Sequence, residues 1–202
     1  GGFSDPWSDG ELTGNGKVTI KDNAVIHNAQ GGAYGAGIGG GYGGGYAGLG
    51  DVTIEGNTTV NATGGVGAAG IGSGVNSVND AAGNGNQITI RSNESGAPTV
   101  NATGGESGID EETDEETEKK IPGGAGIGSG AGDAKANITL EGKVTITATA
   151  GKDNVAIGAN GIEQEFTGLA EGSSITRYNS EGNDISLPGD KVSVTETSSG
   201  GE

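Results

Sequence analysis

A repeat dominates this sequence, and its clearest copy is VTIEGNTTVNATGGVGAAGIGSG, residues 52–74. Within this copy the apolar residue Ile54 is followed six residues later by Val60, and Ile71 comes eleven residues after that. Altered copies occur before and after it, with the corresponding apolar residues at Ile20, Ile26 and Ile38; at Ile90, Val100 and Ile127; at Leu140, Ile146 and Ile157; and, in a truncated last copy, at Leu187 and Val194. Self-similarity at a period of tens of residues is typical of proteins that stack repeated turns. We therefore expect residues 1–202 to form a single elongated domain rather than two globules.

Each complete copy contains three short apolar segments, which predict three strands per turn. In the first segment, alternation places Val52 and Ile54 inside and Thr53 outside. The second segment begins at Val60, and the third is a Gly-Ile-Gly whose glycines permit tight corners. Parallel strands that repeat on three faces predict an all-β fold, a right-handed parallel β-helix (β-solenoid) of about five irregular turns with two inserted segments. The first strands should contribute one interior column, formed by Ile20, Ile54, Ile90, Leu140 and Leu187.

Three segments do not follow the repeat. Residues 1–16 should cap the open end of the stack, with Phe3 and Trp7 as its apolar covering. Residues 106–120 form an acidic insertion with acids first and lysines last, an order that suits either a short exposed helix or a solvated loop. Residues 161–184 form a second insertion, whose apolar side chains should pack over one side of the stack.

The second strand of each turn supplies the first candidate binding surface. Its outward positions carry polar residues in matching places, namely Asn61, Thr63, Asn101 and Thr103, continued by Thr147, Thr149, Thr195 and Thr197. The first copy interrupts these columns with His27 and Ala29. Polar columns on a flat sheet suit a ligand, although threonine is also simply a favourable outward strand residue.

Tyrosines supply the second candidate surface. Tyr34, Tyr42 and Tyr46 fall within thirteen residues of the most glycine-rich stretch. A ring flanked by glycines stands clear of neighbouring side chains, as stacking on a sugar requires. A local cluster that shields the first turns explains the same residues, and the sequence favours neither interpretation.

The charge and the missing residue types exclude several functions. A net charge of −17 argues against nucleic-acid binding, which needs clustered Lys and Arg. It also argues against anionic membrane surfaces, and no apolar run is long enough for membrane insertion. The absence of cysteine excludes disulfides and thiolate metal sites. The charge fits an extracellular protein or one that binds cations.

Calcium is the one cofactor that the sequence suggests, because oxygen ligands recur at the turns. Asp51, Glu55 and Asp153 are the candidate metal ligands. Stacking would bring carboxylates of successive turns close together, and both stay ionised only when a cation or hydrogen-bond donors lie between them.

Catalysis is not expected. The only histidine, His27, lies in an outward column, and no nucleophile elbow accompanies it. The 27 acidic residues lie mostly in turns and in the acidic insertion, which is typical of a solvated surface rather than of a carboxylate pair arranged for glycoside hydrolysis.

The segments GAGIGGG (35–41), AAGIGSG (68–74) and GAGIGSG (124–130), joined to VTI and VNATGG, resemble a group of Gram-positive surface proteins with carbohydrate-binding-type β-helix repeats. The resemblance covers roughly residues 15–200 and concerns corners and core, so it transfers no binding residue. It implies a secreted or cell-wall-attached protein, and some proteins of this group bind plant polysaccharides with calcium. Pectin-cleaving lyases also resemble the chain in fold class, but they generally use a Lys or Arg base, and the sequence shows no basic cluster.

We therefore expect a non-enzymatic extracellular adhesin or glycan-binding module, monomeric as an excised domain, whose partner is a polysaccharide or a host glycan or glycoprotein. A surface that binds a host protein, such as mucin or immunoglobulin, is the alternative left open by the flat columns and the insertions. Ice binding by the Thr-x-Thr ranks and a polysaccharide-lyase-like activity are further alternatives.

Overall fold

The computed structural model describes residues 16–43, 48–80, 83–109 and 119–193, and all regular secondary structure in these ranges is β-strand. The predicted all-β class is therefore confirmed. Most strands belong to three sheets, which we call A, B and C.

Sheet A contains four parallel strands in the order β1 (Gly16–Ile20), β4 (Gly50–Glu55), β7 (Asn86–Arg91) and β12 (Ala136–Glu141). Sheet B contains five parallel strands in the order β2 (Val25–Gln30), β5 (Thr59–Thr63), β8 (Thr99–Thr103), β13 (Thr145–Thr149) and β16 (Ser174–Tyr178). Sheet C contains the short strands β3 (Ile38–Gly39), β6 (Ile71–Gly72), β11 (Ile127–Gly128) and β14 (Ile157–Ala159), all parallel, with β15 (Ile162–Glu163) antiparallel to β14 at its edge. A separate antiparallel pair joins β9 (Gly108–Ile109) to β10 (Lys120–Ile121).

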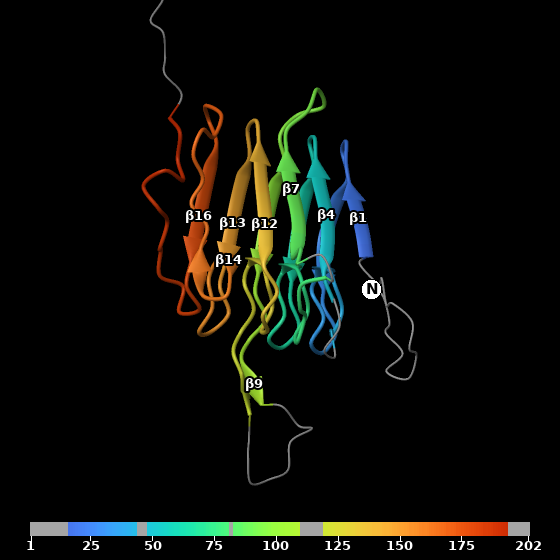
Figure 1. Ribbon diagram of the computed structural model, residues 1–202. Helices are drawn as coiled ribbons and strands as arrows, with labels where there is room; N and C mark the ends of the chain where they lie inside the picture. The colour runs from blue at the N-terminus through green and yellow to red at the C-terminus, as the bar shows by residue number, and fades with distance from the viewer. Residues whose placement is uncertain (1–15, 44–47, 81–82, 110–118, 194–202) are drawn as a thin grey trace, which may run out of the picture.

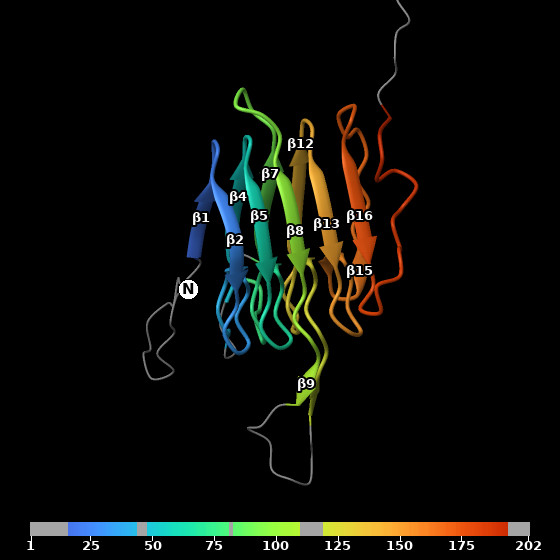
Figure 2. The same cartoon turned by 180° about the vertical axis from the view of Figure 1, so that it is seen from behind.

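The chain passes through sheets A, B and C in that order and then returns to sheet A, so equivalent strands of successive turns lie side by side. Figure 1 shows this stacking for β1, β4, β7 and β12, and Figure 2 shows it from behind for the strands of sheet B. The β9–β10 hairpin projects from the body beyond the ends of the sheet B strands (Figure 1).

Side chains on the inner faces of the three sheets form one apolar core. The register places equivalent residues in columns: Ile20, Ile54, Ile90 and Leu140 in sheet A; Ile26, Val60, Val100, Ile146 and Ile175 in sheet B; and Ile38, Ile71, Ile127 and Ile157 in sheet C. Burying one such side chain stabilises the fold by about 1.5–3 kcal/mol relative to its exposure. The gain depends on the next turn, because each column residue is covered mainly by its neighbours in the stack.

In each of the four parallel strands of sheet C, glycine follows isoleucine for a geometric reason. Gly72 has a φ of 140° and Gly128 a φ of 139°, a region that residues with side chains rarely adopt. A Cβ added to Gly72 would overlap the carbonyl oxygen of Gly128, its partner on the next strand. The Gly-Ile-Gly motif therefore lets the backbones of successive turns approach closely at this corner.

The last turn differs from the prediction. Leu187 was expected in the interior column of sheet A, but among the described residues this sheet ends at β12, and Ile185 is 36% exposed. The fifth strand of sheet B is instead β16, which lies inside the segment expected to be a second insertion. Its residue Ile175 pairs with Ile146 and is fully buried. Residues near Leu187 form a turn, in which Asp190 N donates to the Leu187 carbonyl at 3.0 Å and Pro188 offers no backbone donor.

Several expectations fall outside the described residues: the cap residues Phe3 and Trp7, the helix or loop over residues 110–118, Tyr46, and the last-copy residues Val194, Thr195 and Thr197. The flanks of the acidic insertion are described, and they pair as the antiparallel strands β9 and β10.

Candidate functional site

The outer face of sheet B carries three columns of polar side chains. Strand register aligns Thr59, Thr99, Thr145 and Ser174; Asn61, Asn101, Thr147 and Thr176; and Thr63, Thr103, Thr149 and Tyr178. The predicted binding residues Asn61, Thr63, Asn101 and Thr103 thus come together on the adjacent strands β5 and β8.

The central column contains a short ladder of carboxamides. Asn101 Nδ2 donates to Asn61 Oδ1 at 2.8 Å, and Asn61 Nδ2 donates to the Ile26 carbonyl at 3.5 Å. The 2.8 Å bond joins the two amide groups to each other, and the 3.5 Å contact with the Ile26 carbonyl is weaker. The ladder is therefore an ordered array of donors and acceptors rather than a set of independent surface side chains.

The first strand of the face departs from the expected alignment. The register shifts between Ile26 and Ala29, so Ala29 aligns with the inward-facing Ala62 and packs against the core. Gln30, which was not predicted, is the partner of Thr63. His27 lies in the shifted segment and is exposed. The prediction that Ala29 stands in an outward column is wrong, because one extra residue in the strand reverses the alternation after it.

A groove of about 420 Å³ begins where the third column ends. It is lined by Gln30, Thr63 and Thr103 at the strand ends, by the glycine pairs 31–32, 64–65 and 104–105, and by Ala33, Val66 and Glu106. The glycine pairs continue the stacking, since Gly31 N donates to the Thr63 carbonyl at 2.8 Å and Gly64 N to the Thr103 carbonyl at 2.9 Å. Sequence reasoning missed this groove, although the Gly-Gly that follows each of these strands was a visible signal.

The tyrosines occupy a different place. The rings of Tyr34 and Tyr42 lie 5.7 Å apart between centroids, and Asn76 Nδ2 donates to Tyr42 Oη at 3.1 Å. Tyr34 is half-buried against a small apolar cluster of Ala68, Val75, Ile121 and Ala131, so it does not stand clear of its neighbours. Tyr42 is 45% exposed. Local packing therefore explains Tyr34, and of the two predicted tyrosines that the structure describes, Tyr42 offers the accessible ring.

The three candidate calcium ligands do not come together. Asp51 and Glu55 lie on β4, where Lys17 Nζ is 3.6 Å from Asp51 and Arg91 Nη2 is 2.6 Å from Glu55. Asp153 is exposed on the turn between β13 and β14. Among residues 16–43, 48–80, 83–109 and 119–193, no group of three or more His, Asp or Glu side chains is placed to hold a metal ion.

A buried arginine closes the last described turn, and no pattern in the sequence predicted it. Arg177 occupies the position of Ala148 in an inward column and is fully buried. Its Nε and Nη2 donate to Asp190 at 2.8 and 2.9 Å, and its Nη1 donates to Glu163 at 2.6 Å. Its guanidinium also lies 5.6 Å from the centroid of the Phe166 ring. Burial alone would lower the pKa of Arg177, but the bonds to Asp190 and Glu163 hold it above the ordinary arginine value.

We call Arg177, Glu163 and Asp190 the arginine clamp. Its two carboxylates accept further hydrogen bonds from the backbone. Glu163 accepts from the backbone N–H groups of Ala156 at 2.6 Å and Ile157 at 3.1 Å, besides Arg177. Asp190 also accepts from Leu187 N at 2.7 Å. Glu163 and Asp190 therefore join the chain segments at the end of the stack, and we assign these two carboxylates no chemical role.

No protein-family model, no curated protein and no solved structure matches this chain. The described residues contain no helix that is long and apolar enough to cross a membrane.

Proposed function

We propose that this chain is a right-handed parallel β-helix that serves as a non-enzymatic, extracellular glycan-binding module of a bacterial surface protein. The binding surface is the outer face of sheet B together with the groove at its end. The observation that carries this proposal is the alignment of the polar columns, in which Asn61, Asn101 and Thr147 stand in register across three strands.

The chemistry of these columns suits a sugar. A sugar hydroxyl both donates and accepts hydrogen bonds, and so do the threonine hydroxyl and the asparagine carboxamide. Neighbouring strands lie about 4.7–4.9 Å apart, so the columns offer these groups at a regular spacing. The β-branched threonines and the bonded carboxamides have few rotamers left to lose when a ligand binds.

The groove adds a shaped end to this flat surface. Val66 is 37% exposed at its wall and offers an apolar contact for the C–H face of a sugar ring. Thr63 and Thr103 belong both to the columns and to the groove. A glycan chain that follows the columns can therefore end in the groove.

The absence of enzymatic activity is part of the proposal. We base it on the ion pairs described above. Glu163 and Asp190 bind Arg177, and Glu55 binds Arg91. His27 is an exposed residue of β2.

A glycan array tests the proposal, with the wild-type chain compared with the double variant Asn61→Ala/Asn101→Ala. We expect binding to one class of glycan and its loss in the variant. The matched control is Thr53→Ala/Thr89→Ala, which changes the equivalent outward positions of sheet A and should bind like wild type. Binding to no glycan, or equal loss in both variants, would contradict the proposal.

Recognition of a host protein is the second candidate, and the projecting β9–β10 hairpin favours it, because Ile109 is 49% exposed there. The substitution Ile109→Asp separates the two functions. A glycan site on sheet B survives it, whereas a protein contact made by the exposed Ile109 is lost.

A further inference from the structure

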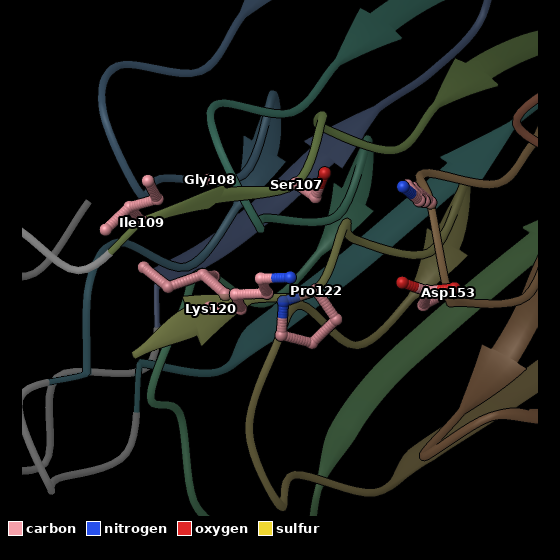
Figure 3. A pocket seen from close by; sticks show the side chains of 8 residues that line it. Ser107, Gly108, Ile109, Lys120, Pro122 and Asp153 are labelled. Carbon is pink, nitrogen blue, oxygen red and sulfur yellow. The ribbon is translucent and has the colours of Figure 1, made fainter. Parts of the chain in front are cut away.

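A cavity of about 370 Å³ lies at the base of the β9–β10 hairpin. Figure 3 shows Ser107 and Gly108 along one wall, Lys120 of β10 and Pro122 just after that strand, and Asp153 across the opening. Lys152 belongs to the same turn as Asp153 and also lines the cavity. The volume lies within the ~300–1,000 Å³ range of small-molecule sites.

Hydrogen bonds hold the turn that carries Lys152 in place. Gly123 N donates to the Lys152 carbonyl at 2.7 Å, and Asn154 Nδ2 donates to the Gly123 carbonyl at 2.7 Å. Asn154 Oδ1 accepts from Val155 N at 2.8 Å. The backbone of this wall is therefore set before any ligand arrives, which reduces the ordering cost of binding.

The charge of the cavity wall is opposite to that of the chain. The chain has 10 Lys and Arg against 27 Asp and Glu, whereas the cavity wall has Lys120 and Lys152 against Asp153 alone. In the part of the chain that the structure describes, neither lysine forms an ion pair within 4.0 Å, unlike Arg91 and Arg177. Two ammonium groups on one cavity repel each other, and a bound anion relieves that repulsion.

We propose that this cavity binds the carboxylate of an acidic sugar, such as a uronic or sialic acid, through Lys120 and Lys152. Charge-assisted bonds from ammonium to carboxylate are the strong polar contacts available here. Ser107 and Asp153 are suited to the sugar hydroxyls, one as donor or acceptor and the other as acceptor. Pro122 and Ile109 offer apolar surface to the ring. This inference rests on the proposed glycan-binding function and names the class of sugar.

The cavity lies next to the groove of sheet B. A Cβ added to Gly108, in the cavity wall, would overlap Cγ1 of Val66, in the groove wall. Consecutive residues of the chain, Glu106 and Ser107, line the groove and the cavity respectively. A single branched or acidic glycan can therefore occupy both sites.

Nuclear magnetic resonance titration of the full chain with sodium glucuronate tests the proposal. We expect amide shifts concentrated at Ser107, Gly108 and Asp153. Lys120→Gln and Lys152→Gln should each weaken binding about ten- to a hundredfold, as expected for loss of a hydrogen bond to a charged group. Lys143→Gln removes the same charge on the turn that precedes β13, outside the cavity wall, and should change the affinity less than about twofold.

Two ligand controls define the chemistry. The methyl ester of glucuronate lacks the negative charge and should not bind, and acetate lacks the ring and should bind more weakly than glucuronate. Shifts scattered over the surface, equal binding of the ester, acetate binding as tight as glucuronate, or an equal effect of Lys143→Gln would each overturn the proposal.

The acidic residues of segment 110–118 provide a further check, because removing their negative charge makes the chain as a whole less repulsive to an anionic ligand. Changing these Asp and Glu residues to Asn and Gln should preserve or tighten glucuronate binding. Loss of binding in this variant would overturn the assignment to the lysines.

The outcomes also separate this inference from the function on which it rests. If a neutral glycan shifts the amide resonances of Thr63 and Thr103 while glucuronate shifts none of those in the cavity wall, only the acidic-sugar proposal is overturned. Binding of glucuronate at Lys120 and Lys152 supports the acidic-sugar proposal even if the Asn61→Ala/Asn101→Ala variant binds glycans like wild type. In that case the assignment of the glycan site to sheet B is wrong.

Discussion

Arg91 Nε donates to Oε2 of Glu55, its register partner on the preceding strand of sheet A, at 2.8 Å. On the following strand Glu141 is the register partner of Arg91, and its Oε2 lies 3.9 Å from Arg91 Nη1. Stacking therefore does align acidic residues, and an arginine stands between them. The hydrogen bond that Arg91 donates to Glu55 is the main reason that the pKa of Arg91 lies above its ordinary value.

We predict that Arg91→Gln lowers the melting temperature, because Glu55 and Glu141 then face each other across one strand without a cation. The effect should shrink in high salt, which screens exposed charges. Adding Glu141→Gln to this variant should recover part of the loss. If the double variant melts no higher than Arg91→Gln, repulsion between the two carboxylates is not the cause.

Arg177→Met should destabilise the chain far more than Arg91→Gln does. It leaves Asp190, which is 1% exposed, and Glu163 without their shared cation. Removing one partner of a buried ion pair typically costs about 3–5 kcal/mol, which chemical denaturation can measure. Arg177→Lys should also destabilise, since an ammonium cannot reproduce the two bonds to Asp190. Near wild-type stability of Arg177→Met would show that the clamp does not hold the last turn.

Gly72→Ala tests the close approach of successive turns, with Gly83→Ala as its matched control. Both glycines have positive φ, 140° and 80°, but only at Gly72 would the new methyl group meet another backbone. Gly83→Ala should cost about 1–2 kcal/mol for the left-handed backbone conformation alone. Gly72→Ala should cost more, because a φ of 140° is a backbone conformation essentially confined to glycine and overpacking adds about 1–3 kcal/mol. Equal losses of stability in denaturant unfolding would show that the corner has room for a side chain.

Calcium should raise the melting temperature no more than magnesium chloride at the same ionic strength. The candidate ligands Asp51 and Glu55 already face Lys17 and Arg91, so both ions should act mainly by screening the net charge of −17. A specific site would add stability, about 2.7 kcal/mol at a hundred times its Kd. A rise that only calcium produces would restore the calcium hypothesis.

The interior of the repeat was predictable because each inward position meets the same neighbours in every turn. The spacing of Ile54, Val60 and Ile71 marked three strands, and the register bears out all three columns through β12, β13 and β14. The outward pairing of Asn61 with Asn101 followed from the same alternation.

The last turn was not predictable from the apolar pattern, because Arg177 takes an inward position that the repeat gives to alanine. Its partners Glu163 and Asp190 are 14 and 13 residues away in the chain, so no local sequence motif predicts the arginine clamp. The register shift of β2 near His27 was not predicted, because one extra residue does not stand out in the pattern of apolar residues. The groove was missed because glycine backbone, rather than side chains, builds much of its wall.

Titration calorimetry with the strongest glycan of the array tests most directly whether the polar columns of sheet B bind a glycan. Asn61→Ala/Asn101→Ala removes the carboxamide ladder and should weaken binding by about tenfold or more, while Thr53→Ala/Thr89→Ala on sheet A should leave the Kd unchanged. An unchanged Kd in the Asn61→Ala/Asn101→Ala variant, with its fold intact by circular dichroism, would contradict the account.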